Sequence, residues 1–223
     1  MNALSFKTSP LNKPLKITFG VILIYLAYQA LDHGIHGLRY FQNNPNTNTN
    51  PVVLLTHIGT GFIALILGPW QFWDGLRNRF LKVHRLMGKI YFLSVLISGT
   101  FGLGLGIYRL FFAQQLVFGS GIVGLALAWL FTGIIAYRFI RNRQIKKHQE
   151  WMVRNYVVTF GFVTYRIGSD WMLQQGFTYN DTEIMAWLCW VPQLMIVDYF
   201  FQLRKQKTSL KESNVKIKEF THQ

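Results

Sequence analysis

The chain has 223 residues, of which 51% are hydrophobic and 14% are charged, and its formal net charge is +14. A soluble domain has about 25% charged residues, so this composition excludes an ordinary soluble globular protein. Lys and Arg lie almost entirely in alternate gaps between apolar runs, which is typical of membrane proteins and argues against a nucleic-acid-binding surface. The single cysteine, Cys189, excludes an internal disulfide and a cysteine-based zinc site.

The first part of the chain is predicted to place one helix in the membrane. Residues 1–16 are polar with three lysines, and we expect them to form a basic cytoplasmic tail. The apolar run 17–35 has no convincing small-x-small cleavage site after it, so it is predicted to be a retained membrane helix and not a signal peptide. The polar residues 42–51 carry no charge and belong to a predicted outer loop.

Two further membrane helices are predicted on either side of a basic segment. The run 52–69 ends at Pro69, which removes a backbone donor and ends or kinks a helix. Apolar and basic residues then alternate with helical spacing over 70–87, a pattern typical of an amphipathic helix in the membrane interface. The glycine-rich run 88–108 follows, and its glycines indicate close packing between helices in lipid.

Three more membrane helices complete the predicted bundle, at 117–140, 151–171 and 184–203, before a polar basic cytoplasmic tail over 204–223. Each predicted span has about 17–24 residues, which suits a hydrocarbon core about 30 Å thick. Gaps rich in Lys and Arg alternate with gaps that lack them. The sequence therefore predicts an all-α bundle of six transmembrane helices in the cytoplasmic membrane, with both termini cytoplasmic.

Polar residues follow one face of the predicted fifth helix. Asn155, Thr159, Arg166 and Ser169 recur at helical spacing, and Asp170 is placed to pair with Arg166. Polar and ionisable groups are costly inside a membrane, so each needs a reason. The stripe has two interpretations: hydrogen bonds and an ion pair that join helices, or the wall of a polar cavity.

The histidines of the predicted spans fall into two layers about one bilayer apart. The topology places His57 in the outer layer with Asp32, His33 and His36. The inner layer contains His84 and His148, which open the third and fifth helices, together with Arg85, Arg154 and Asp198. Each layer brings together residues from several predicted helices, so each is a candidate site.

Several of these residues also form motifs that resemble a known family. The motifs are His57, Gly68-Pro69-x-Gln71-Phe72, Leu76-Arg77-x-Arg79, His84-Arg85-x-x-Gly88-Lys89-x-Tyr91, His148-x-x-Trp151-Met152-x-Arg154-x-Tyr156 and Arg166. Over residues 52–171 the chain resembles a family of bacterial membrane proteins catalogued as a domain of unknown function, number twenty-three-zero-six. The resemblance implies a multi-pass membrane protein and brings no activity, substrate or cofactor.

The first functional hypothesis is a membrane protein that moves electrons through b-type haem. Haem iron is held axially by histidine, and its propionates favour basic partners. In this hypothesis His84 and His148 ligate an inner haem, and His57 with His36 or His33 ligates an outer one. Arg154 and Arg166 are the candidate partners of the propionates or of another anion.

Three other hypotheses remain open at this stage. A transporter or ligand-binding protein could use the fifth-helix stripe, with Arg166 meeting an anionic group, although no internal repeat supports a transporter. A metal-dependent enzyme could use His84, His148 and Asp198, but the chain has no closely spaced metal-binding motif. Finally, the polar residues could only pack helices in a structural or accessory protein. The lipid bilayer is the single partner that the sequence predicts.

Overall fold

The computed structural model describes Tyr28 and residues 50–221, apart from the side chains of 207–208 and 211–221. The chain divides into two units, Met1–Asn48 and Thr49–Gln223, and the fold described below belongs to the second. The predicted helix 17–35, its Asp32, His33 and His36, and the tail 1–16 lie outside the described residues. Every regular element in the described part of the chain is helical.

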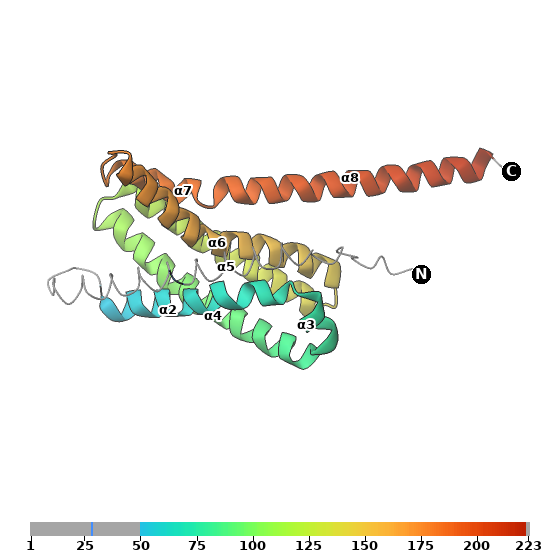
Figure 1. Cartoon of the computed structure of the whole chain (residues 1–223), viewed down its shortest axis with the longest axis horizontal. Helices are drawn as coiled ribbons and strands as arrows, with labels where there is room; N and C mark the ends of the chain where they lie inside the picture. The colour runs from blue at the N-terminus through green and yellow to red at the C-terminus, as the bar shows by residue number, and fades with distance from the viewer. Residues whose placement is uncertain (1–27, 29–49, 222–223) are drawn as a thin grey trace. The chain divides into compact units, whose positions relative to one another are not determined.

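The elements of the second unit, in chain order, are α2 (Pro51–Gln71), α3 (Asp74–Arg79), α4 (Leu81–Phe111), α5 (Leu116–Arg141), α6 (Ile145–Gln174), the 3-10 helix η1 (Asp181–Ile184), α7 (Met185–Leu188) and α8 (Val191–Thr221). Asn50 caps α2, because its side-chain oxygen accepts a hydrogen bond from the Val52 N–H at 2.9 Å. Short turns join α4 to α5 and α5 to α6, so neighbouring helices run in opposite directions (Figure 1).

Four helices form a bundle. Helix α4 packs against α2 and α5, while α6 packs against α5 and α2, so α4 and α6 lie diagonally across the bundle and run in parallel. The buried core between them includes Ala64, Tyr91, Val95, Trp129 and Val158. Helices α7 and α8 pack on the outside, against α5 and α6 respectively. The bundle has one end with the basic residues of α3 and the α5–α6 turn, called the basic end below.

The helices agree with the predicted runs but differ at several boundaries. Helix α4 begins at Leu81, so the last third of the predicted interfacial segment 70–87 belongs to the following long helix. The break lies at Phe80, whose φ of −129° and ψ of 59° are not helical. The predicted helix 184–203 is divided into η1, α7 and α8, with Pro192 in the first turn of α8. Proline has no N–H and fits at the start of a helix better than in its interior.

Four stretches are long and apolar enough to cross a membrane among the described residues: Pro51–Gln71, Leu81–Phe111, Leu116–Arg141 and Asp181–Gln206. Helix α6 has the length to cross a bilayer, but its polar stripe lowers its hydropathy. The described part of the chain is therefore all-helical and contains several helices that can cross a membrane. The count of six and the cytoplasmic termini remain predictions.

Single cysteines test whether α6 crosses the membrane. In a Cys189→Ala background, Asn142→Cys lies in the α5–α6 turn and Asn180→Cys lies beyond the other end of α6. Because basic gaps stay in the cytoplasm, we expect an impermeant thiol reagent to label only Asn180→Cys on intact cells. Equal labelling of the two variants would contradict a transmembrane α6, provided that both label fully after permeabilisation.

Candidate functional site

A hydrogen-bonded network of buried side chains lies at the centre of the bundle. The Tyr91 hydroxyl of α4 donates to Asn155 Oδ1 of α6 at 2.6 Å and lies 3.1 Å from Thr159 Oγ1. Trp129 of α5 donates its indole N–H to Thr159 Oγ1 at 2.8 Å. The Asn155 amide donates to the Trp129 carbonyl and to Thr132 Oγ1 at 2.8 and 2.9 Å. Tyr91 and Asn155 therefore fix which faces of the diagonal helices oppose each other.

The two inner histidines lie one layer below this network, toward the basic end. His84 precedes Tyr91 by seven residues on α4, and His148 precedes Asn155 by seven residues on α6. Seven residues are close to two helical turns, about 10.5 Å along the axis, so each histidine shares a face with its partner in the network. Because the faces of Tyr91 and Asn155 meet, His84 and His148 also face each other, and the two imidazoles interact electrostatically.

The two imidazoles differ in their hydrogen bonds. His148 donates its Nδ1–H to the Ala136 carbonyl of α5 at 2.9 Å, which leaves the Nε2 lone pair to bind another group. The Nδ1 atom of His84 is buried and has no hydrogen-bond partner among the described residues. A buried polar atom without a partner costs about 1–3 kcal/mol, so a group other than these residues would stabilise His84. Arg77 and Arg85 make the surroundings of His84 positive.

Gln71, at the end of α2, joins this layer. Its side chain is 9% exposed, and its Nε2 atom is buried without a hydrogen-bond partner in the described part of the chain. Its Oε1 atom lies 3.1 Å from the position that a Cβ on Gly88 would take. Gly88 is one turn beyond His84 on the same face of α4. The Gln71 side chain therefore lies against the turn of α4 that follows His84. We call Gln71, His84 and His148 the basic-end polar layer.

Arg154 belongs to a different contact at the same end of the bundle. Its Nε donates to Asp198 Oδ1 of α8 at 2.6 Å, and its guanidinium lies over the rings of Trp151 and Phe201 at 5.0 and 4.7 Å. Glu150 lies 4.0 Å from Arg154 on the same helix. Arg154 thus holds α8 against α6, while its buried Nη1 atom has no hydrogen-bond partner among the described residues.

Two other charged residues singled out in the sequence, Arg166 and Asp198, have different surroundings. Arg166 is exposed near the end of α6, and its ion pair with Asp170 stays a prediction. Asp198, a candidate metal ligand, pairs with Arg154 instead. No group of three or more His, Cys, Asp or Glu side chains that could hold a metal ion occurs within residues 50–206.

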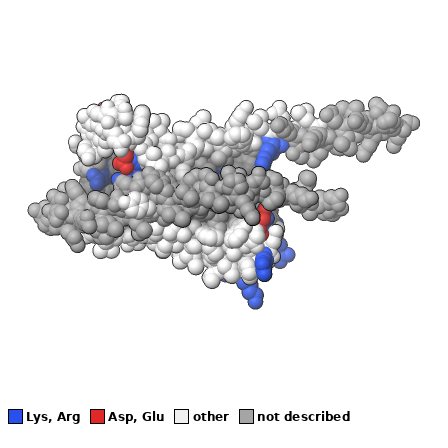
Figure 2. All heavy atoms as spheres, in the orientation of Figure 1, with Lys and Arg blue, Asp and Glu red and all other residues white. Residues whose placement is uncertain are grey.

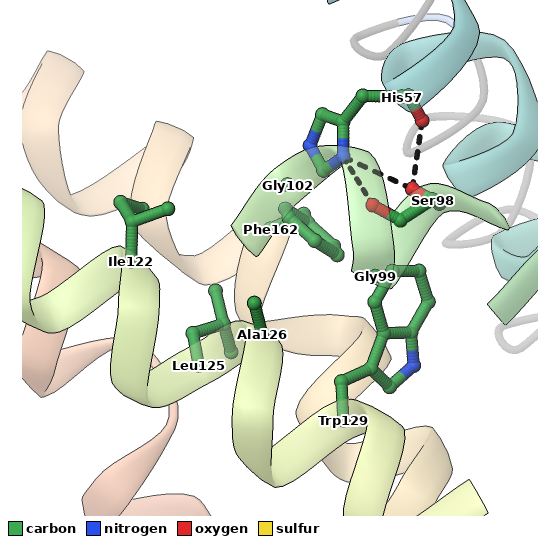
Figure 3. Close-up of a pocket in the computed structure, with 9 residues that line it drawn as sticks. All are labelled: His57, Ser98, Gly99, Gly102, Ile122, Leu125, Ala126, Trp129 and Phe162. Atoms are coloured by element: carbon green, nitrogen blue, oxygen red, sulfur yellow. Dashed lines mark hydrogen bonds between the residues drawn. The ribbon is translucent and has the colours of Figure 1, made fainter. Parts of the chain in front are cut away.

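His57 lies in the second turn of α2, toward the other end of the bundle, and its side chain is packed on α4 (Figure 3). Its Nδ1–H donates to the Ser98 carbonyl at 2.8 Å, and the Ser98 hydroxyl donates back to the His57 carbonyl at 2.8 Å. A Cβ on Gly102 would lie 2.8 Å from the imidazole, and Phe162 meets the ring edge-on at 5.5 Å between centroids. One side of this partly buried imidazole is therefore closely packed, with glycine required beside it.

The cavity that His57 lines among the described residues is small. It is lined mainly by apolar residues of α4, α5 and α6 and has a volume of about 10 Å³, which is roughly the room that one water needs. The contacts of His57 favour a packing role that joins α2 to α4. The other residues of the predicted outer site, His33 and His36, lie outside the described residues.

Sequence reasoning missed the residues that organise the site. In the sequence, Tyr91 and Gln71 stand out only as members of the family motifs, and Trp129, Thr132 and Ser98 belong to no pattern. The available signal was the spacing of seven residues between His84 and Tyr91 and between His148 and Asn155, which places each pair on one face.

Comparison with known proteins identifies a family over most of the chain. The family model described as predicted membrane protein (DUF2306) matches residues 54–201. This match runs from α2 through the first third of α8 and includes His84, Tyr91, His148 and Asn155. It continues past residue 171, where the resemblance seen in the sequence ends. No curated protein and no solved structure shows significant similarity to the chain. The chain therefore belongs to the DUF2306 family of predicted membrane proteins.

Proposed function

We propose that this membrane protein takes part in electron transfer and binds b-type haem between His84 and His148. The observation that carries the proposal is their placement on diagonal helices of a four-helix bundle, on faces aligned by the Tyr91–Asn155 hydrogen bond. Cofactor sites in helix bundles are built in this way, from side chains of facing helices that project into the core. The bound haem would supply one-electron chemistry.

Some hydrogen bonds of the basic-end polar layer are those expected around a haem held by two histidines. Histidine ligands usually donate the second ring N–H to a carbonyl or carboxylate, as His148 does to Ala136. The buried Nδ1 of His84 and the Nε2 of Gln71 have no hydrogen-bond partner among the described residues, so both atoms can bind a further group. Arg77 and Arg85 lie within electrostatic range of His84 and make its surroundings positive, although Arg77 pairs with Asp74 and Arg85 lies on the outer face of α4.

The chain's own residues would hold and isolate the ligand. The Tyr91–Asn155 network keeps the two helix faces in register, and the Ala136 carbonyl fixes the orientation of the His148 ring. The core above the layer is closely packed, with Trp129 and Val95 fully buried, so water would reach the ligand from the basic end. An outer haem at His57 forms no part of this proposal.

A second candidate is the binding of a small ligand that accepts hydrogen bonds. The observation that favours it is the unpaired Nε2 of Gln71, which can only donate, together with the unpaired Nδ1 of His84 in the same layer. A carboxylate or carbonyl group would satisfy both nitrogen atoms. This candidate needs His84 and Gln71 but not His148, so variants distinguish the two functions.

An absorption spectrum of the detergent-purified protein from haem-replete cells tests the first candidate. We expect a red protein with sharp visible bands after dithionite reduction. His84→Ala and His148→Ala should each abolish these bands, since six-coordinate haem needs both ligands. His57→Ala, normalised to folded protein, should keep them. A colourless and well-folded preparation, or bands that survive both inner substitutions, would show that these histidines do not hold haem.

A further inference from the structure

A stripe of positive charge lies on the face of α4 opposite the core. Lys82, Arg85 and Lys89 are three and four residues apart, so they follow one side of the first turns of α4 over about 10 Å. All three side chains are exposed, whereas His84 and Tyr91 face the opposite way, into the bundle. Figure 2 shows Lys and Arg gathered at this end of the molecule, around the turn that contains α3.

Within the part of the chain that the structure describes, no acidic side chain pairs with the stripe. None of Lys82, Arg85 and Lys89 forms an ion pair within the described residues, and the acidic residue of the neighbouring α3, Asp74, pairs with Arg77. Three like charges along one helix face repel one another, so their arrangement favours an external anion. The anion must approach from outside the bundle.

The surroundings of the stripe are those of a membrane interface. Leu86 and Leu93 lie beside it on the same side of α4, and their exposed fractions are 59% and 57%. Trp70 and Trp73 are also exposed at this end, and tryptophan is enriched where lipid head groups meet the hydrocarbon. Lys89 lies about two turns inside a helix that can cross a membrane, at a depth from which a lysine extends toward the head groups.

We propose that Lys82, Arg85 and Lys89 form a binding site for the phosphate of an anionic phospholipid, whose acyl chains lie against Leu86 and Leu93. A lipid fits better than a free phosphate because the site continues without a break from cations to exposed apolar side chains. Basic residues at the cytoplasmic side of membrane helices bind anionic head groups in this way. The site is on the opposite face of α4 from His84 and does not depend on haem.

The site is tested with the full-length protein in detergent by titrating phosphatidylglycerol, cardiolipin or phosphatidylcholine and counting bound lipids by native mass spectrometry. We expect both anionic lipids to bind more tightly than phosphatidylcholine. Each cation near anionic lipid contributes about 1 kcal/mol, so the triple variant K82Q/R85Q/K89Q should bind anionic lipid about 100-fold more weakly. Inorganic phosphate should compete poorly, because it lacks acyl chains.

A matched triple variant provides the control. R141Q/R143Q/K146Q removes the same charge from the exposed α5–α6 turn at the same end of the bundle, outside the stripe. We expect it to retain most of the anionic-lipid binding. Should the stripe variant fold poorly, Lys89→Gln alone, at an exposed position, should still weaken binding about fivefold. Equal losses in the two triple variants, or equal binding of phosphatidylcholine and the anionic lipids, would overturn the proposal.

Discussion

Gly119→Ala is expected to lower the free energy of unfolding by about 2 kcal/mol, because one added methyl group would overpack a contact between two helices. A Cβ at this position of α5 would lie 2.5 Å from the backbone nitrogen of Leu110 and 2.7 Å from its Cα. Backbone atoms of α4 cannot rotate away as a side-chain tip can. The two helices would therefore have to separate at this point.

Gly104→Ala is the matched control for this prediction. Gly104 lies in α4, and a Cβ there would meet nothing within 4 Å. Alanine is favoured over glycine in a helix by about 1 kcal/mol, so this change should be neutral or slightly stabilising. The measurement is unfolding by a denaturing detergent, followed by circular dichroism. Similar midpoints for the two variants would mean that α4 and α5 do not approach as closely at Gly119 as the structure shows.

These two glycines illustrate what the sequence could predict. Glycine-rich apolar runs indicated closely packed membrane helices, and α4 and α5 do pack against each other. However, both glycines lie in similar glycine-rich apolar runs. Only their positions in space distinguish the close contact at Gly119 from the open surface at Gly104. Composition identifies the kind of interface, while the facing residues are set by how the helices rotate against each other.

Helix boundaries were predictable where hydrophobicity changes and less so elsewhere. The predicted run 117–140 agrees with α5, Leu116–Arg141, almost residue for residue. In contrast, α6 and α8 continue well into polar sequence, since backbone hydrogen bonds propagate a helix whether or not its side chains are apolar. A count of apolar residues therefore measures the part of a helix that suits lipid, and not its whole length.

The candidate site was predictable in its residues but not in its organisation. His84 and His148 were placed in one layer from topology alone, and the structure places them on facing sides of diagonal helices. The polar stripe on α6 was likewise expected, but its two halves differ. Asn155 and Thr159 are fully buried and hydrogen-bonded, whereas Arg166 is exposed near the end of the helix. Periodicity identifies a face, but it does not show where the neighbouring helices end.

Asn155 makes three hydrogen bonds in the buried network, and its side chain is fully buried. Asn155→Leu keeps a side chain of similar size and removes all three bonds. Polar contacts between membrane helices contribute about 0.6 kcal/mol each, and the Tyr91 hydroxyl would lose its acceptor, so we expect a loss of about 2–3 kcal/mol in unfolding free energy. If haem binds between His84 and His148, the protein's affinity for haem should fall as well. The reason is that the hydrogen bond aligning the facing sides of α4 and α6 is lost.

A double-mutant cycle with Tyr91→Phe separates this network from a general effect of altering the core. Tyr91→Phe removes the donor to Asn155 Oδ1 and leaves the ring in place, so it should cost about 1–2 kcal/mol. Because both substitutions break the same hydrogen bond, the double variant should lose less than the sum of the two single losses, by at least 0.5 kcal/mol. Gln174→Leu, at the exposed end of α6, controls for replacing an amide by leucine and should change stability little. Strictly additive losses from Tyr91→Phe and Asn155→Leu would show that the two side chains act independently, and the alignment of the diagonal helices would then need another cause.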